Sequence, residues 1–239
     1  MKKSIIFFLL VLSAQVVHTT FAQNCDLSKT ERRQLKTMLE EEKLAEEVYS
    51  NFHEKWNKPI FKNIAEAEQR HLTSLLELAG KCSIDIPGTV EHRKVGKFNK
   101  KELQQFYDKA IIEGSNSLVQ ALQISATLEE MDIHDLMKAR KDAQNTLLIQ
   151  QYDRLLAASG NHLRAFTKHL RESGIENGPT VLSKQKYEEI LSEGIEKPKC
   201  GEKKGAACKG VQSKKGCCAG KSAQEKGSKK ACCKAKTDS

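Results

Sequence analysis

Residues 68–71 read Glu-Gln-Arg-His, and they lie where a helix is expected to be apolar. Glu68 and His71 belong to a series of positions whose spacing alternates between three and four, which is the spacing of one helix face. The apolar members of this series are Phe61, Ile64, Leu75 and Leu78. A carboxylate and an imidazole on a buried face are costly unless each has a partner, and a bound metal cation suits both.

Three further segments repeat this pattern of an apolar helix face that carries a polar residue near its middle. They are residues 35–52 with Glu42, residues 118–139 with Glu129 and Asp132, and residues 148–166 with His162. Glu, Asp and His are all metal-binding residue types. The four segments together predict an all-α protein, a four-helix bundle that encloses a buried site.

The same residues carry a resemblance to known proteins. Dinuclear-metal bundles of the ferritin-like superfamily use one Glu from each of two helices and Glu-x-x-His from each of the other two. Glu42, Ala45 and Tyr49 also form a Glu-x-x-Ala-x-x-x-Tyr pattern that is similar to the first helix of rubrerythrin-type proteins. Residues 35–195 are most similar to the bacterial domain of unknown function 2202 family, through the segments EEKLAEEVY, NIAEAEQRHL, LEEMDIHDL and NHLRAF.

The expected fourth helix departs from the ferritin-like pattern, because Ser159 stands where the resemblance implies a Glu three residues before His162. Asp132 follows Glu129 by three residues on the same helix face and restores the number of carboxylates. The six proposed metal ligands are therefore Glu42, Glu68, His71, Glu129, Asp132 and His162. Glu130 and Asp135 remain alternatives to the two acids of the third helix.

Each proposed ligand also has an ordinary structural explanation. Glu42 belongs to the acidic run 40–42, which alone is typical of a solvated helix face, and a Glu-x-x-His pair is commonly a surface pair. His162 alone is typical of a core histidine that bonds a backbone carbonyl or Tyr152. The coincidence on four helices favours the metal site. The histidines without such company, expected at the surface, are His53, His92, His134 and His169.

Turn and capping residues predict the connections. Glycines and prolines interrupt the chain between the second and third core helices, at Gly80, Pro87, Gly88 and Gly96. A long crossover is what a ferritin-like topology requires there. Asn99 with Glu102 predicts a capped short helix that ends near Gly114, and Ser115 or Ser117 then starts the third core helix. The fourth core helix is expected to stop by Gly174, and Ser183 to cap a last helix that ends near Ser192.

The start of the 239-residue chain reads as a targeting signal. Lys2 and Lys3 precede an apolar stretch, and small residues before Gln23 suit cleavage, so residues 1–22 are predicted to be a signal peptide. No other apolar run approaches the ~20 residues that cross a bilayer. Residues 23–196 are therefore expected to form the bundle domain of a soluble periplasmic or secreted bacterial protein.

Residues 197–239 differ in composition from the rest, with 13 lysines against three acids. This tail has almost no large apolar residue and is predicted to be disordered. Its cysteines are Cys200, Cys208, Cys217, Cys218, Cys232 and Cys233. Thiolates beside lysines bind soft or borderline ions such as Cu(I) or Zn(II). Disulfides, or a basic tail that contacts an anionic surface, are alternatives, and nucleic acid is not expected as a partner.

The resemblance implies iron chemistry at the six ligands, although manganese or zinc would fit the same donors. Two iron ions would oxidise Fe(II) with O2 or reduce peroxide, as in a ferroxidase or peroxidase. Glu42 and Glu129 would bridge or cap the ions, Glu68 and Asp132 would chelate, and each histidine would hold one ion. Tyr49 and Tyr152 would donate hydrogen bonds or electrons.

Two functions of other classes also fit the sequence. One is a non-catalytic metal sequestration or trafficking protein that uses the cysteine-rich tail. The other is a helical scaffold whose polar core residues are satisfied by hydrogen bonds. The sequence leaves the choice between a homodimer and a monomer open, and likewise whether Cys25 and Cys82 pair.

Overall fold

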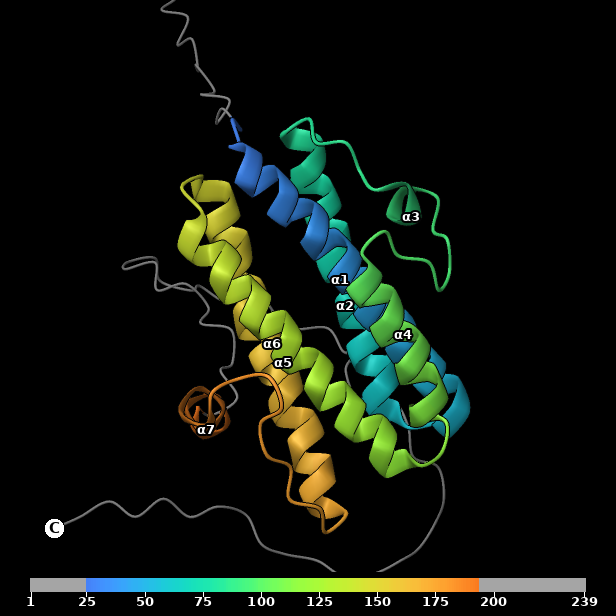
Figure 1. The fold of residues 1–239 in the computed structure, drawn as a ribbon. Helices are drawn as coiled ribbons and strands as arrows, with labels where there is room; N and C mark the ends of the chain where they lie inside the picture. The colour runs from blue at the N-terminus through green and yellow to red at the C-terminus, as the bar shows by residue number, and fades with distance from the viewer. Residues whose placement is uncertain (1–24, 194–239) are drawn as a thin grey trace, which may run out of the picture. The chain divides into compact units, whose positions relative to one another are not determined.

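The computed structural model describes residues 25–193 of the chain. Helices within this range, labelled in Figure 1, are α1 (Lys29–Trp56), α2 (Pro59–Lys81), α3 (Gly88–Glu91), α4 (Lys101–Gly114), α5 (Leu118–Asp142), α6 (Thr146–Glu172) and α7 (Lys184–Ser192). Residues 25–193 contain no strand, and the prediction of an all-α fold is confirmed. The expected signal peptide, the lysine-rich tail and its six cysteines lie outside the described residues.

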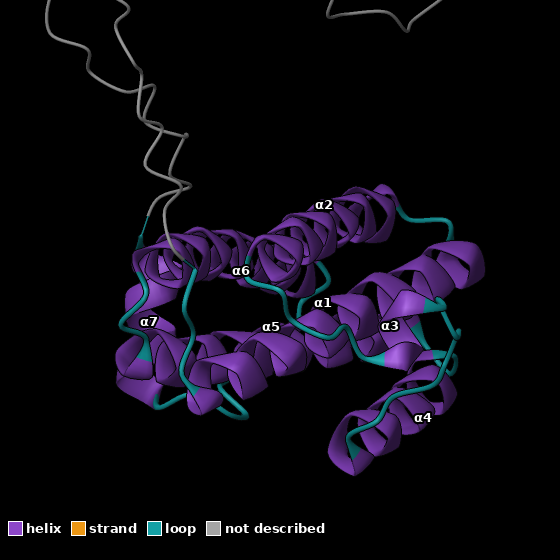
Figure 2. Cartoon of the chain, turned by 90° about the horizontal axis from the view of Figure 1, so that it is seen from above, coloured by secondary structure: helices purple, strands orange, loops and turns teal. Residues whose placement is uncertain are grey.

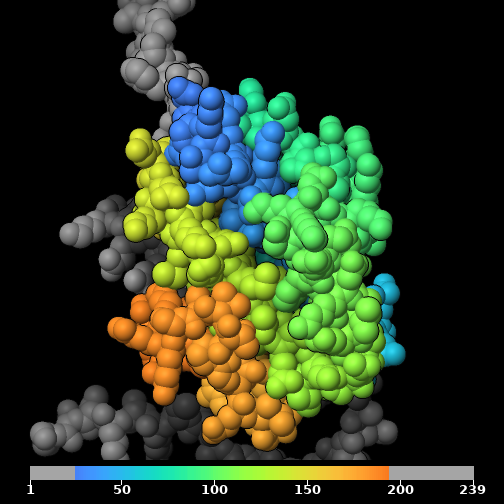
Figure 3. Space-filling model, viewed as in Figure 1, coloured from blue at the N-terminus to red at the C-terminus, as the bar shows by residue number. Residues whose placement is uncertain are grey.

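The four long helices pack as two pairs. α1 lies along α2 and α5 lies along α6, and the pairs meet where α1 contacts α5 and α2 contacts α6 (Figures 1 and 2). The connection from α2 to α5 contains α3 and α4, and α4 packs against both α1 and α5. The green surface of this connection covers much of α1 in the space-filling view of Figure 3. Within residues 25–193, none of the helices has the length and apolar character of a membrane span.

Side-chain caps fix where most of the long helices begin. Ser28 forms a capping box with Glu31 at the start of α1, and Ser117 accepts a hydrogen bond from the Gln120 amide at the start of α5. Ser183 caps α7 in the same way, and α7 ends at Ser192. The predicted start and end of the last helix are therefore confirmed.

The predicted cap of α4 is wrong. Lys100 occupies the N-cap position of this helix and makes no side-chain cap. The backbone amide of Asn99 instead donates to Glu40 Oε1 at 2.7 Å. A buried carboxylate of α1 thus holds the segment that was expected to cap itself.

The apolar interior consists of two clusters that are separated along the helix axes. One is rich in aromatic rings and includes Tyr49, Phe52, Phe61 and Phe166. The other contains mainly aliphatic side chains, among them Leu35, Met38, Leu75, Leu136 and Leu155. Each of the four long helices contributes to both clusters, so a polar layer at mid-length lies between two apolar ends.

Two local features hold helix ends close to their neighbours. A Cβ at Gly114 would collide with the Phe52 ring, so only glycine lets the end of α4 approach α1 this closely. Cys25 and Cys82 form a disulfide between the residues before α1 and the end of α2, with Cα atoms 4.8 Å apart. The pairing that the sequence left open is thus made in the structure.

Candidate metal centre

The polar layer between the two apolar clusters brings together all six sequence-predicted ligands. They are Glu42 on α1, Glu68 and His71 on α2, Glu129 and Asp132 on α5, and His162 on α6. Three of the carboxylic side chains, Glu42, Glu68 and Glu129, are each only 2% exposed. The helix periodicity explains this placement, because each residue occupies a core-facing position of its helix.

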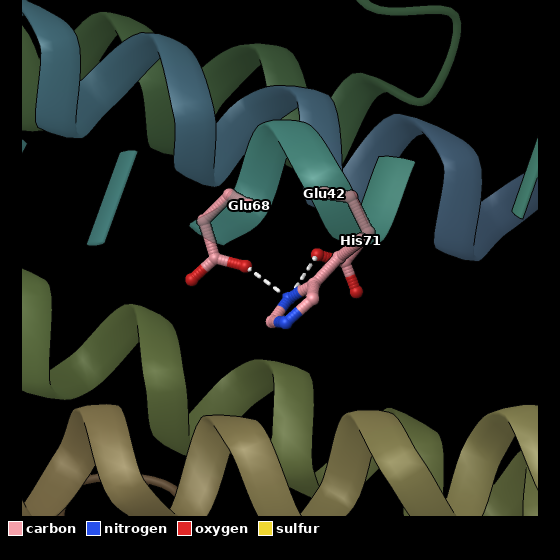
Figure 4. A group of neighbouring side chains, drawn as sticks. All are labelled: Glu42, Glu68 and His71. Carbon is pink, nitrogen blue, oxygen red and sulfur yellow. Dashed lines mark hydrogen bonds and ion pairs between the residues drawn. The ribbon is translucent and has the colours of Figure 1, made fainter. Parts of the chain in front are cut away.

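Glu42, Glu68 and His71 form the first of two triads (Figure 4). His71 Nδ1 lies 2.7 Å from Glu68 Oε2 and 3.3 Å from Glu42 Oε2. The two carboxylates approach the ring nitrogen from different helices, as Figure 4 shows. The potential ligand atoms lie within 4.8 Å of one another, which one metal ion can span.

The second triad consists of Glu68, Glu129 and His162. His162 Nδ1 lies 2.7 Å from Glu68 Oε1 and 3.6 Å from Glu129 Oε1. Glu68 therefore belongs to both triads and turns one oxygen toward each imidazole. The His71 and His162 rings stack with centroids 5.6 Å apart, which makes the two triads neighbours across the α2–α6 contact.

Several buried atoms of this layer have no hydrogen-bond partner. They are Glu42 Oε1, Glu68 Oε1, Asp132 Oδ1 and His162 Nδ1. The close pair of Glu68 Oε1 and His162 Nδ1 does not have the alignment of a hydrogen bond. An unsatisfied buried polar atom costs about 1–3 kcal/mol, so four of them are a large local cost. Oxygen and nitrogen donors that face one another in this way fit a bound cation.

Ser159 of α6, which precedes His162 by three residues, contacts an acid of α5. Its hydroxyl donates to Asp132 Oδ2 at 2.5 Å, so the α5 carboxylate reaches the position that precedes His162 by three residues. The other oxygen of Asp132 stays unpaired.

The two alternative acids of α5 lie elsewhere. Glu130 accepts hydrogen bonds from the backbone amides of the segment before α7, at Thr180, Val181 and Leu182. Asp135 pairs with His134 and Lys138, and its side chain is 40% exposed. Neither belongs to a triad of the described residues.

The two tyrosines have different surroundings. Tyr49 donates a hydrogen bond to Glu129 Oε1 at 2.6 Å and so orients a member of the second triad. The buried hydroxyl of Tyr152 makes no hydrogen bond, to His162 or to any other described residue. Among the histidines predicted at the surface, His92 and His169 are exposed, whereas His53 and His134 are half-buried.

Burial and mutual charge set the protonation of the acids. Burial raises the pKa of Glu42 to about 8, against the opposing effect of His71. Burial likewise raises the pKa values of Glu129 and Asp132 above their ordinary range. Burial also acts to raise the pKa of Glu68, but the charge of His162 and the hydrogen bond from His71 hold it below its ordinary value.

The imidazoles respond in the opposite direction. Burial disfavours their charged form, yet Glu42 and Glu68 raise the pKa of His71 to about 10. Glu68 and Glu129 together raise the pKa of His162 well above its ordinary value. Without metal, protons on these rings and acids balance the charge of the layer. A divalent cation can take over that role, because metal binding displaces ligand protons.

The acidic run 40–42 is not a solvated helix face. Glu40, Glu41 and Glu42 are 3%, 7% and 2% exposed, since the connection from α2 to α5 covers this part of α1. Glu40 accepts hydrogen bonds from the Thr89 hydroxyl and the Asn99 amide. The sequence did not predict the burial of Glu41. The connection from α2 to α5 that covers it has no periodic pattern from which its path could be predicted.

The described domain is all-helical, and its interior holds two carboxylate–imidazole triads. These features place the chain in the class of helical proteins with a candidate dinuclear metal centre. Residues 31–194 match the family model described as "Uncharacterized protein domain (DUF2202)". The chain belongs to this family, as the sequence resemblance predicted.

A relative from Methanocaldococcus jannaschii, the uncharacterized protein MJ0754, is 39% identical over 171 residues, which are 72% of this chain and 91% of the relative. A solved structure is also similar, the crystal structure of hypothetical protein MJ0754 from Methanococcus jannaschii DSM 2661. It matches with a TM-score of 0.69 and 38% identity, over 72% of this chain and 97% of that chain.

Proposed function

We propose that this protein is a ferritin-like four-helix bundle that binds two divalent metal ions, iron foremost, between its long helices. In this proposal α1, α2, α5 and α6 are the bundle helices, and α3 and α4 belong to the long crossover. Glu42 and His71 hold one ion, Glu129 and His162 hold the other, and Glu68 is shared. The observation that carries the proposal is the position of Glu68, with one oxygen 2.7 Å from each imidazole Nδ1.

The shared carboxylate changes the roles that the sequence suggested. Glu68 would hold both ions, while Glu42 and Glu129 would each hold one of them. Asp132, held by Ser159, supplies the fourth carboxylate. Manganese or zinc fits the same donors, so the supply of metal decides the occupant.

A bound pair of iron ions supplies redox chemistry with O2 or peroxide, which makes the protein an oxidoreductase of the ferroxidase or peroxidase type. The chain contributes a largely buried polar layer between two apolar clusters. Tyr49 fixes the orientation of Glu129 and holds a proton at its hydroxyl. The imidazoles of His71 and His162 are 19% and 12% exposed, so small molecules reach the layer from the α2–α6 side.

Metal counting with matched variants tests this proposal. In a full chain whose six cysteines after residue 199 are replaced by serine, we expect two tightly bound irons after anaerobic loading and desalting. Glu68→Gln should lose both ions because both triads share it, whereas Glu129→Gln should keep one. Glu66→Gln, an exposed acid of the same helix, should keep two. The absence of stoichiometric iron from the parent chain would refute the site.

The reaction is tested separately from binding. Addition of O2 or peroxide to the loaded chain should convert Fe(II) to Fe(III), and the Glu68→Gln variant should not do so above the rate of free iron. Bound iron that stays reduced would favour the sequestration alternative. No metal together with unchanged stability of Glu68→Gln would favour the scaffold.

We also propose that the protein is exported, to the periplasm or the medium. The disulfide between Cys25 and Cys82 supports this location, because such bonds persist in oxidising compartments and are rare in the cytosol. Fractionation of the source cells, with thiol labelling of each fraction, tests the location. A cytosolic protein with reduced Cys25 and Cys82 would contradict it.

A further inference from the structure

A small cavity of about 10 Å³ lies against the triad acids Glu42, Glu68 and Glu129, and neither imidazole lines it. Carboxylic side chains line one part of it, and the apolar side chains of Leu103, Leu128 and Met131 line another. The volume is about that of one water-sized sphere. The cavity thus has room for a single small particle among acids that are shielded from solvent.

Glu41 lines this cavity and is not used by the proposed dinuclear site. The residue is 7% exposed, and its Oε2 atom has no hydrogen-bond partner. The neighbouring Glu40 is buried to the same degree, but two donors satisfy its carboxylate. Burial of Glu41 is therefore unexplained by the hydrogen bonding of the described residues.

Asp132 lines the same cavity and also has one unpaired oxygen, Oδ1. A buried acid of α1 and a half-buried acid of α5, each with a buried oxygen that lacks a partner, thus share one small space. This accumulation of negative charge favours a cation as the missing partner.

We propose that Glu41 and Asp132 form a third cation position beside the dinuclear site, which accepts a hard divalent ion such as Mn(II) or Fe(II). The inference rests on the proposed function, because Asp132 also belongs to that site. Its ligands are all oxygen atoms and include no imidazole, so it binds more weakly than the two triads and fills last.

Titration of the full chain with Mn(II), an ion that thiolates bind weakly, counts the positions directly. Electron paramagnetic resonance of the free ion should give three bound Mn(II) per chain at saturation for the wild type. Glu41→Gln should saturate at two, with the two tighter affinities unchanged. Glu40→Gln is the matched control, a buried neighbour with its own hydrogen-bond donors, and should retain three.

The stability of the metal-free protein provides a second measurement. Glu41→Gln should leave Tm unchanged or raise it, since the variant removes a buried acid that lacks a partner. Glu40→Gln should lower Tm, since it weakens hydrogen bonds to a charged acceptor. A folded Glu41→Gln protein that lacks one ion then shows loss of a ligand rather than loss of the fold.

Two other outcomes overturn the inference in distinguishable ways. Saturation of both wild type and Glu41→Gln at two ions, or of both at three, would exclude the third position and leave the dinuclear proposal intact. A wild-type chain that binds no Mn(II) and no iron would refute both proposals together.

Discussion

Glu68 is the residue on which the candidate centre depends, because each of its oxygens lies 2.7 Å from a different imidazole. Its neighbours are positioned by hydrogen bonds from outside the triads. Ser159 bonds Asp132, and Tyr49 bonds Glu129. Such supporting bonds commonly change metal affinity as much as some ligands do.

Tyr49→Phe tests whether the hydrogen bond from the Tyr49 hydroxyl to Glu129 supports metal binding. Loss of the hydroxyl leaves Glu129 free to rotate, and we expect metal affinity to fall about 10-fold, measured by competition with a chelator. The loss of one buried hydrogen bond to a carboxylate should cost about 1.5 kcal/mol in urea unfolding.

Tyr187→Phe is the control for this prediction. Its hydroxyl donates to the Asn177 carbonyl at 3.0 Å, and neither residue belongs to a triad. Stability should fall while metal affinity stays unchanged. Equal affinities for wild type and Tyr49→Phe would show that Glu129 does not depend on this bond.

At the scale of elements, Glu31 connects the start of α1 with the turn between α5 and α6. Its carboxylate accepts hydrogen bonds from the backbone amides of Ser28, Gln144 and Asn145. Burial acts to raise the pKa of Glu31, but these amides outweigh it and lower the pKa from 4.5 to about 2. The unfolded chain therefore binds the proton more tightly than the folded one.

The sign of the pH dependence follows from this difference. Glu31 stabilises the fold fully above pH 4.5, and its contribution is lost as the pH falls toward 2. In thermal unfolding, wild type should exceed Glu31→Gln in Tm at pH 6, and the gap should narrow below pH 4.5. Glu66→Gln should follow the wild-type curve. A gap that is constant with pH would contradict the role of the Glu31 charge.

Glu130 plays a comparable part for α7. Its carboxylate accepts the amides of Thr180, Val181 and Leu182, which position the segment before that helix. Glu130→Ala should cost about 3 kcal/mol, because three backbone amides, of which that of Leu182 is buried, lose their acceptor. Hydrogen exchange should accelerate in residues 178–192 while the metal content stays the same. Loss of an ion with α7 unaffected would instead make Glu130 a ligand.

At the scale of the whole molecule, the disulfide joins the two ends of the α1–α2 pair. It links residues separated by 57 positions, and the chain-entropy estimate for a loop of this length is about 4 kcal/mol. Reduction should therefore lower the Tm of the full chain by roughly 10 °C. Cys82→Ser should start at the lower Tm and respond little to reductant. An unchanged Tm on reduction would show that the link does not stabilise the fold.

Much of the fold was predictable because long helices carry their own periodic signal. The four apolar faces, the Ser183 cap and the end of α7 at Ser192 followed from spacing and capping alone. Asn99 was assigned wrongly because a local capping pattern competes with a distant acceptor, Glu40, that no local rule reveals. The burial of Glu41 escaped prediction for the same reason, since the covering connection lacks periodicity.

The sequence by itself determined the all-α class, the family and the set of six acids and histidines that share core-facing positions. Helix periodicity is a property of neighbouring residues, so it can be recognised without the fold. Only the tertiary structure decided that Glu68 lies between both imidazoles, that Ser159 directs Asp132, and that Glu41 remains without a partner. These are contacts between different helices, and they depend on how the helices rotate and pack against one another.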